Sequence, residues 1–283
     1  MKRKINIIVA NPAGNITIFV KDRFGREDYQ KVATRLLDMK EIEGEQVAFI
    51  LETPECGRAQ GKMEMCGLEF CGNASRSFGL IRAVDMGIDG KGQVFVDVSG
   101  CNEILTVDVD TKTGFTKVAM PLPANMAEID LSKLPIDDLK TNPEAWMLLR
   151  RAGLIDFGGI VHVVISGIEP KSKTFEIIKE KIMEMYNPPA MGVMFCDSKE
   201  NKMVPVVYVR DVDSTYFEGS CGSGTTACAA AFAKVMGDGT HNFSFPQPAG
   251  TIDSTVEIHR GQIQSITIEG IVSLKEMEVE IDI

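Results

Sequence analysis

Stretches in which apolar and polar residues alternate recur along the whole chain. Alternation of this kind is typical of half-buried strands, and it predicts strands at 94–98 and 104–109. Further strand signals lie at 161–165, 203–209, 256–259, 263–269 and 276–283, and the short apolar run at 5–10 is also interpreted as a strand. A turn sequence at residues 110–114 joins two strands into a hairpin. Helical spacing of apolar residues, with charges on the opposite face, predicts helices at 27–39 and 172–185. We therefore expect a mixed α/β (α+β) fold in which strands dominate each half.

The two halves of the chain also repeat one motif. Cys71 is followed by Gly-Asn-Ala-Ser and then an apolar, helix-like run, and Cys221 is followed by Gly-Ser-Gly-Thr and a second such run, 150 positions later. Each cysteine is preceded by a strand that begins near a polar residue, Asn15 or His162, at 56 and 59 residues before it. A motif repeated at similar spacing predicts two duplicated lobes that face each other.

Length and composition narrow the class of protein. A chain of 283 residues is long enough for two domains, and 44% hydrophobic with 25% charged residues excludes a disordered or fibrous protein. The formal net charge of −10 argues against nucleic acid as a partner, and no apolar run approaches the ~20 residues of a membrane helix. We expect a cytoplasmic protein with no membrane contact. The stretch at 121–143, with four prolines, is predicted to be the least structured.

Seven cysteines, an odd number, do not indicate a disulfide scaffold. A zinc site is not expected, because Cys56, Cys66 and Cys71 have the wrong spacing, no CxxC occurs and the three histidines are scattered. The ordinary role of a free cysteine is that of a small buried apolar residue, and Cys228, inside the second helix-like run, fits that role. We predict no metal ion.

Cys71 and Cys221 stand apart because each precedes a predicted helix start with small residues after it. Unpaired backbone N–H groups and the helix dipole should lower the pKa of such a thiol and attract an anion such as a carboxylate. Two sites of this kind suggest one carboxylate held between two thiols. Inversion of an amino-acid α-carbon needs that arrangement, with a base on one face and an acid on the other.

Several segments resemble diaminopimelate epimerases. Residues 71–78 are similar to the family motif CGNGARCF, and residues 221–229 to CGSGxxACA. Residues 159–164 are similar to GNPHVV, residues 13–15 to the GLGND near the family's start, and residues 44–46 weakly resemble its GxDQ-like turn. These matches follow the family's order from residue 13 to residue 228.

The resemblance implies a cofactor-independent amino-acid racemase or epimerase. Its fold would be two pseudo-symmetric lobes, 1–125 plus 272–283 and 126–271, each a mostly antiparallel sheet around a central helix, with the active site between them. Cys71 and Cys221 would be the acid/base thiols. Carboxylate donors would come from Gly72, Asn73, Gly222 and Ser223, and Asn15, Gln46 and His162 would line the site.

Departures from the family pattern bear on the substrate. Val209 replaces the family's glutamate, Ile160 replaces an asparagine, and residues 189–193 lack another asparagine, so a second charged centre would lose its partners. Arg210 remains. Glu218 could hold the substrate ammonium or could simply be an acidic residue favoured by the helix dipole. We therefore expect a small-molecule substrate with one amino-acid centre, histidine first, with diaminopimelate as the alternative.

Other functions stay open at this level. The chain could be a non-catalytic amino-acid-binding protein on the same scaffold, although it retains both cysteines. A thiol oxidoreductase is disfavoured because neither cysteine lies in CxxC. Cys66 could replace Cys71 in a shifted alignment, but only Cys71 precedes Gly-Asn-Ala. The sequence also leaves a homodimer open.

Overall fold

The computed structural model describes residues 2–53, 57–137, 142–197, 200 and 202–282. These residues form two compact units. Unit 1 comprises Met1–Ala119 and Ile268–Ile283, and unit 2 comprises Met120–Thr267. The lobe boundaries expected from the sequence lay after residues 125 and 271. The long strand β16 crosses the unit boundary after Thr267, since it begins in unit 2 and ends in unit 1.

Unit 1 is a sheet wrapped around one central helix. Its strands lie in the order β7-β6-β5-β4-β3-β2-β1-β17, mostly antiparallel, with parallel pairs at β2/β3 and β4/β5. The elements are β1 (Lys2–Asn11), β2 (Thr17–Val20), η1 (Arg26–Asp28), α1 (Tyr29–Leu37), β3 (Gln46–Leu51), β4 (Gly61–Met65), α2 (Gly72–Asp85), β5 (Lys91–Val98), β6 (Leu105–Asp110), β7 (Phe115–Ala119) and β17 (Ser273–Asp282).

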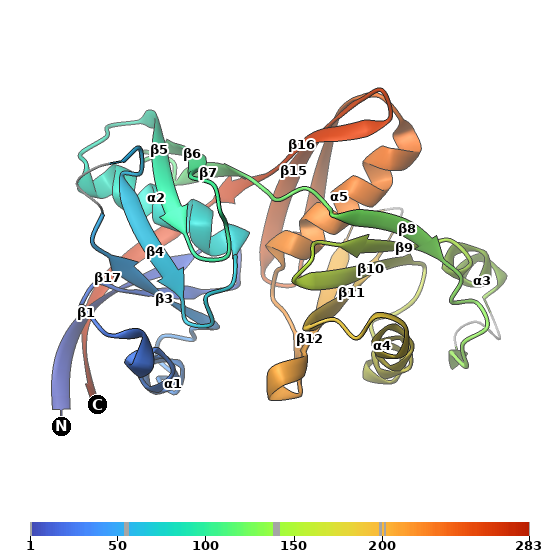
Figure 1. Ribbon diagram of the computed structural model, residues 1–283, viewed down its shortest axis with the longest axis horizontal. Coiled ribbons are helices and arrows are strands. Elements are labelled where there is room, and N and C mark those ends of the chain that lie inside the picture. The colour runs from blue at the N-terminus through green and yellow to red at the C-terminus, as the bar shows by residue number, and fades with distance from the viewer. Residues whose placement is uncertain (1, 54–56, 138–141, 198–199, 201, 283) are drawn as a thin grey trace. The chain divides into compact units, whose positions relative to one another are not determined.

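The central helix of unit 1, α2, is buried on nearly all sides. It packs against β5, β6 and β7, and Figure 1 shows these strands around it. A Cβ atom on Gly79 would overlap the side chain of Val107, so this glycine lets the helix approach β6 closely. Phe78 is fully buried and stacks on Phe19 at 6.1 Å between ring centroids. Loss of such a ring costs about 3–5 kcal/mol, so α2 is anchored firmly.

Unit 2 contains a six-stranded sheet and a second group of strands. The sheet has the order β13-β12-β11-β10-β9-β8, antiparallel except for β10/β11, and β14, β15 and β16 are neighbours in that order. The elements are β8 (Asn125–Ile129), α3 (Pro143–Leu149), β9 (Ala152–Asp156), β10 (Ile160–Ser166), α4 (Ser172–Tyr186), β11 (Ala190–Cys196), β12 (Met203–Val209), η3 (Arg210–Val212), β13 (Ser214–Phe217), α5 (Gly222–Met236), β14 (Gly239–Gln247), β15 (Gly250–His259) and β16 (Gln262–Ile271).

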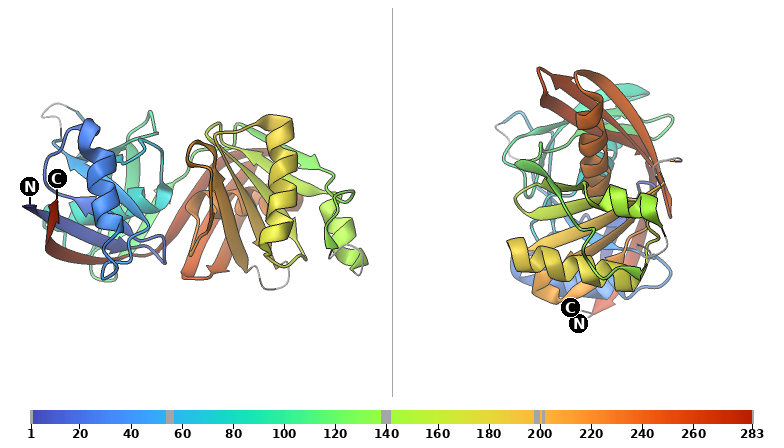
Figure 2. Two further views of the ribbon diagram at one scale, coloured as in Figure 1. Left: turned by 90° about the horizontal axis from the view of Figure 1, so that it is seen from below. Right: turned by 90° about the vertical axis from the view of Figure 1, so that its right-hand side faces the viewer.

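The two faces of the six-stranded sheet carry different helices. Val161 and Val163 of β10 pack with Phe175 of α4 in one apolar core. Side chains alternate between faces along a strand, so His162 points to the opposite face, where α5 lies against β10 and β11. Figure 2 shows α4 along the outer side of this sheet. The central helix α5 therefore occupies in unit 2 the place that α2 occupies in unit 1.

The predicted mixed fold is confirmed, including the hairpin between β6 and β7 and the helices α1 and α4. Part of the segment 121–143 is more ordered than its prolines suggested, because β8 at residues 125–129 pairs with β9, which follows the segment. The Asn-Met-Ala-Glu-Ile sequence of β8 alternates too weakly to indicate a strand, and the pairing partner supplies the order. No helix in the described part of the chain is long and apolar enough to cross a membrane.

Candidate active site

The two motif cysteines occupy the same structural position, the N-cap of a central helix. Cys71 precedes α2 with φ −133° and ψ 113°, and Cys221 precedes α5 with φ −137° and ψ 113°. Each sulfur accepts an N–H bond at 3.4 Å from the residue three positions later, Ala74 or Gly224. An extended residue whose side chain accepts from the third helical N–H is a standard N-cap, here made with sulfur instead of oxygen.

The next turn of each helix repeats the match. The hydroxyls of Ser75 and Thr225 each donate to the carbonyl of the capping cysteine at 2.7 Å, and their backbone N–H groups reach the same carbonyl at 2.8 and 2.9 Å. Small residues occupy the first turns, so the N-terminal amides are not covered by bulky side chains. Such a terminus attracts a carboxylate.

In unit 1 the sulfur is held by amide side chains. We call Asn15, Gln46, Cys71, Asn73 and Arg76 the Cys71 cluster. The Nε2 of Gln46 donates to the sulfur at 3.3 Å and to Oδ1 of Asn15 at 2.9 Å. Nδ2 of Asn73 also reaches that Oδ1, at 3.4 Å. Asn15 has φ 57°, in a short turn between β1 and β2 that brings it to the helix start.

In unit 2 the sulfur meets a hydroxyl group that is in turn hydrogen-bonded to an imidazole. We call His162, Glu218, Cys221, Ser223 and Gln247 the Cys221 cluster. The hydroxyl of Ser223 lies 3.5 Å from the sulfur and 2.9 Å from Nε2 of His162. Gln247 accepts from the backbone N–H of Cys221 at 2.8 Å, so this glutamine holds the cap and not the sulfur.

His162 is fully buried, and burial lowers its pKa to about 3, which keeps the ring neutral. A Cβ atom on Gly192 of the neighbouring strand would overlap the imidazole, so this glycine makes room for the ring. Within the described residues, Nδ1 of His162 has no hydrogen-bond partner. The ring therefore acts as a neutral group that orients the Ser223 hydroxyl.

The pKa values of both thiols are raised, which corrects the prediction that the helix starts would lower them. Burial raises the pKa of Cys71, while the N–H of Ala74 and the amide of Gln46 lower it. Burial raises the pKa of Cys221 well above its usual range, and the charge of Glu218 adds to this. The helix N–H groups act in the predicted direction, but loss of water outweighs them.

The other candidate residues separate into two groups. The structure joins Asn15, Gln46 and Asn73 to Cys71, and His162, Glu218 and Ser223 to Cys221. Arg210 instead donates to the carbonyl of Asn187 at 2.9 Å and lies 3.7 Å from Asp211.

Of the other thiols, Cys66 follows β4 and does not precede a helix; its sulfur lies 3.8 Å from the side chain of Gln30. Cys228 is fully buried, as predicted, but its sulfur lies 3.3 Å from that of Cys196, a contact the sequence did not indicate. Cys56 lies outside the described residues.

Sequence reasoning missed Arg76 and Gln247. Arg76 stands inside the quoted motif, but nothing in the sequence indicates that its guanidinium turns inward. Gln247 is the last residue of β14, 26 positions after Cys221, and matches no motif. Strand pairing brings Gln247 to the start of α5, whereas Arg76 lies on α2 itself and is turned inward by acceptors on Pro12 and Thr116, which come from other parts of unit 1.

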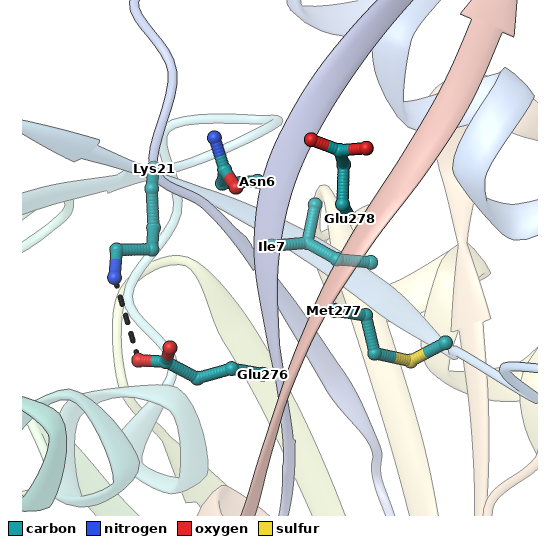
Figure 3. Close-up of a pocket in the computed structure, with 6 residues that line it drawn as sticks. All are labelled: Asn6, Ile7, Lys21, Glu276, Met277 and Glu278. Atoms are coloured by element: carbon teal, nitrogen blue, oxygen red, sulfur yellow. Dashed lines mark hydrogen bonds and ion pairs between the residues drawn. The ribbon is translucent and has the colours of Figure 1, made fainter.

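The described residues contain no cluster of three or more His, Cys, Asp or Glu that could hold a metal ion. A surface pocket of about 240 Å³ lies on unit 1 beside β1 and β17, lined by charged side chains such as Lys21 and Glu276 (Figure 3). It includes no residue of either cysteine cluster, so it does not belong to the candidate site.

Comparison with known proteins identifies the family. A model described as the histidine racemase CntK N-terminal domain matches residues 4–277. The chain belongs to the histidine racemase family. A histidine racemase of Fusobacterium nucleatum subsp. nucleatum is 35% identical over 263 residues, which cover 89% of this chain and 90% of the relative. A histidine racemase of Staphylococcus aureus is 26% identical, with 86% and 85% covered. This protein is therefore an isomerase.

Solved structures support the same fold. A PhzF-family phenazine biosynthesis protein of Bacillus anthracis matches with a TM-score of 0.69 at 15% identity, covering 98% of this chain and 99% of that one. A hydroxyproline epimerase of Agrobacterium vitis matches with a TM-score of 0.64 at 14% identity, covering 99% and 92%. At such identities these likenesses concern the fold, and they confirm the epimerase-like architecture expected from the sequence.

Proposed function

We propose that this protein interconverts L- and D-histidine by two-base proton transfer, with Cys71 and Cys221 as the acid/base pair. Membership of the histidine racemase family supports the reaction and the substrate. The matched N-caps carry the residue assignment: a reaction that runs in both directions needs two groups that can exchange the roles of acid and base, and these two thiols have nearly the same backbone angles and the same N–H contact.

The two cysteines and the substrate account for every proton and electron pair in the reaction. One cysteine, as thiolate, takes the α-proton, so that an S–H bond forms as the Cα–H bond breaks. The electron pair delocalises into the substrate carboxylate as an enolate. The other cysteine, as thiol, delivers its proton to the opposite face, so that a new Cα–H bond forms and this sulfur becomes the thiolate. The reverse reaction exchanges the two roles.

Raised thiol pKa values suit this chemistry. A buried thiol stays protonated near neutral pH and can act as the acid, and the Glu218 charge favours the thiol form of Cys221. The Gln46 and Ala74 donors favour the thiolate form of Cys71. Cys71 therefore loses its proton more readily than Cys221, and we assign Cys71 as the base that takes the first α-proton and Cys221 as the acid.

The helix N-termini are the proposed carboxylate donors. As the enolate forms, negative charge grows on the carboxylate oxygens, and N–H groups at a helix start stabilise it without reorganising. In this proposal the backbone amides of Gly72, Gly222 and Ser223 supply those donors. The side chain of Asn73 is already bonded to Arg76 and Asn15, so it contributes by holding the cluster together.

The walls near Cys221 favour a substrate with one charged centre. An apolar row crosses β10, β11 and β12 and consists of the register partners Ile160, Ala190 and Val209. Ile160 lies two residues before His162 on the same strand, so this row is next to the row that contains His162 and on the same face of the sheet. A second ammonium or carboxylate against this row would lose its water without gaining a partner, which costs several kcal/mol. An imidazole side chain, neutral for much of the time at neutral pH, carries less of this cost.

The test compares substrates at equal enzyme concentration in D2O, with α-proton exchange followed by NMR and enantiomer ratio by chiral chromatography. We expect L-histidine to exchange and racemise with a kcat/KM at least ~100-fold above that of LL-diaminopimelate, since burying an unpaired charge costs several kcal/mol. Preference for diaminopimelate would overturn the substrate assignment. Absence of exchange with every amino acid would overturn the racemase proposal.

A further inference from the structure

Arg76 lies fully buried on α2, one turn after the capping cysteine. Its Nε donates to Oδ1 of Asn73 at 3.2 Å, one terminal nitrogen donates to the hydroxyl of Thr116 at 3.2 Å, and the other donates to the carbonyl of Pro12 at 2.8 Å. A guanidinium is a planar, permanently charged donor that cannot accept a hydrogen bond. Every group that meets it must therefore present an acceptor atom.

This one-way donor fixes the orientation of the amides that follow. Because Asn73 gives its Oδ1 to Arg76, its Nδ2 points the other way, to Oδ1 of Asn15. Because Asn15 presents its oxygen, Gln46 must present Nε2 to it. The same Nε2 group then reaches the sulfur of Cys71 at 3.3 Å. An amide that is free to rotate could equally offer its oxygen.

Arg76 also holds the backbone that carries Asn15. The carbonyl of Pro12 accepts its bond, and the next three residues, Ala13, Gly14 and Asn15, all have positive φ, at 67°, 83° and 57°. Non-glycine residues rarely adopt this conformation, so a turn with two of them needs outside support. The guanidinium supplies it from within α2.

We propose that Arg76 is a positioning residue for the reaction: through Asn73 and Asn15 it fixes Gln46 with its NH2 group toward Cys71. This inference rests on the proposed function and deepens it, because it explains why Gln46 offers the sulfur in unit 1 a donor at 3.3 Å, closer than the 3.9 Å from the sulfur to the acceptor Oδ1 of Asn15. A donor stabilises the thiolate that takes the α-proton. We call the series Arg76–Asn73–Asn15–Gln46 the amide relay.

The charges around Cys71 bear on the expected result. The carboxylate of Glu69, in the segment between β4 and α2, raises the pKa of Cys71, as does burial, while the N–H groups of Asn73 and Ala74 lower it. The amide relay adds the Gln46 donor to the lowering side. With the relay broken, the Thr17 hydroxyl, which accepts from Nε2 of Gln46 at 2.8 Å, is the remaining partner of this amide. A hydroxyl can also donate, so Gln46 can then turn its oxygen toward the sulfur. The pKa of Cys71 rises because the Gln46 donor is lost from the side that lowers it.

The test measures the alkylation rate of individual cysteines by iodoacetamide against pH, with site-resolved mass spectrometry of the full-length protein. Arg76→Met removes every donor of the guanidinium. We expect the Cys71 profile to move to higher pH by about one unit, or about tenfold slower alkylation at neutral pH, the size of one hydrogen bond to a charged group. Cys221, in unit 2, is the control in the same sample and should not move.

Two further variants keep the test sharp if Arg76→Met does not fold. Arg76→Lys keeps the charge but loses the planar fork, so we expect an intermediate shift. Gln46→Met removes the last donor at a part-buried position and should slow Cys71 alkylation about tenfold at neutral pH. An unchanged Cys71 profile in folded Arg76→Met or Arg76→Lys overturns the relay, as does an unchanged profile in Gln46→Met.

The readout also separates this inference from the proposed function. Alkylation reports on the Cys71 thiol whether or not the enzyme racemises histidine, so a failed racemase assay leaves the relay measurable. In an active enzyme, loss of the relay should lower kcat with little change in KM for L-histidine, because the thiolate acts in proton transfer and not in substrate binding. A fall in stability alone, with an unchanged Cys71 profile, would indicate a purely structural role.

Discussion

The Cys71 and Cys221 clusters share a backbone and differ in almost every side chain around the sulfur. Both caps have the same φ, ψ and N–H distance. In unit 1 the sulfur meets the amide of Gln46, whereas in unit 2 it meets the hydroxyl of Ser223, backed by neutral His162. The helix start thus supplies the position of each thiol, and side chains from the surrounding strands determine its preferred protonation state.

The two glutamines make the difference concrete. Gln46, at the start of β3, donates directly to sulfur, while Gln247, at the end of β14, accepts from the backbone of Cys221 and donates to Thr225 at 2.9 Å. One residue type therefore tunes the thiol in one unit and stiffens the cap in the other. A reaction that needs one base and one acid benefits from this asymmetry.

The largest expected effect is the loss of racemase activity when either thiol is removed, and it shows whether the two thiols contribute equally to catalysis. Cys71→Ala and Cys221→Ala should each lower kcat for histidine racemisation by about 10²–10⁴-fold, the usual contribution of a general acid or base. The protein should still fold, with the free energy of unfolding lowered by about 0.5–2 kcal/mol, because each substitution removes the sulfur that caps a helix. Cys101→Ala is the control and should keep full activity, because the Cys101 sulfur is hydrogen-bonded to the carbonyl of Glu103 and belongs to neither cluster. Near-normal turnover by either cluster variant would contradict the two-thiol mechanism.

A second prediction concerns the third helical position, which is Ala74 in unit 1 and Gly224 in unit 2. A Cβ atom on Gly224 would overlap the thioether of Met194, which is fully buried. We expect Gly224→Ala to lower the free energy of unfolding by about 1–3 kcal/mol through overpacking, measured by urea denaturation. The reciprocal Ala74→Gly should cost about 0.5–1 kcal/mol from backbone entropy. A Gly224→Ala protein as stable as the wild type would show that the space around α5 is not limiting.

The third prediction concerns His162, one of three histidines, all of which lie in unit 2. The pKa of His162 is lowered to about 3 in the folded protein, against about 6.5 when unfolded. Below pH 6.5 the unfolded chain binds a proton that the native state does not, so stability falls with acidification. Between pH 7 and pH 5 we expect a loss of about 2 kcal/mol, measured by urea denaturation. His162→Gln should flatten this dependence; an equally steep dependence in that variant would contradict it.

Local patterns in the sequence predicted the repeated part of the site. Small residues after Cys71 and Cys221, followed by apolar runs, indicate helix starts, and both caps form at those residues. Alternation along the chain predicted strands such as β12 and the hairpin of β6 and β7. These features depend on interactions between residues a few positions apart, so the sequence by itself determines them.

The tertiary structure decided the environment of each sulfur. Gln46 reaches Cys71 only because β3 lies within the sheet around α2, and Gln247 reaches Cys221 only because β14 returns beside α5. Burial reversed the predicted direction of both thiol pKa values, and pairing with β9 ordered β8. Strand pairing and loss of water depend on residues far apart in the chain, and local periodicity carries no information about them.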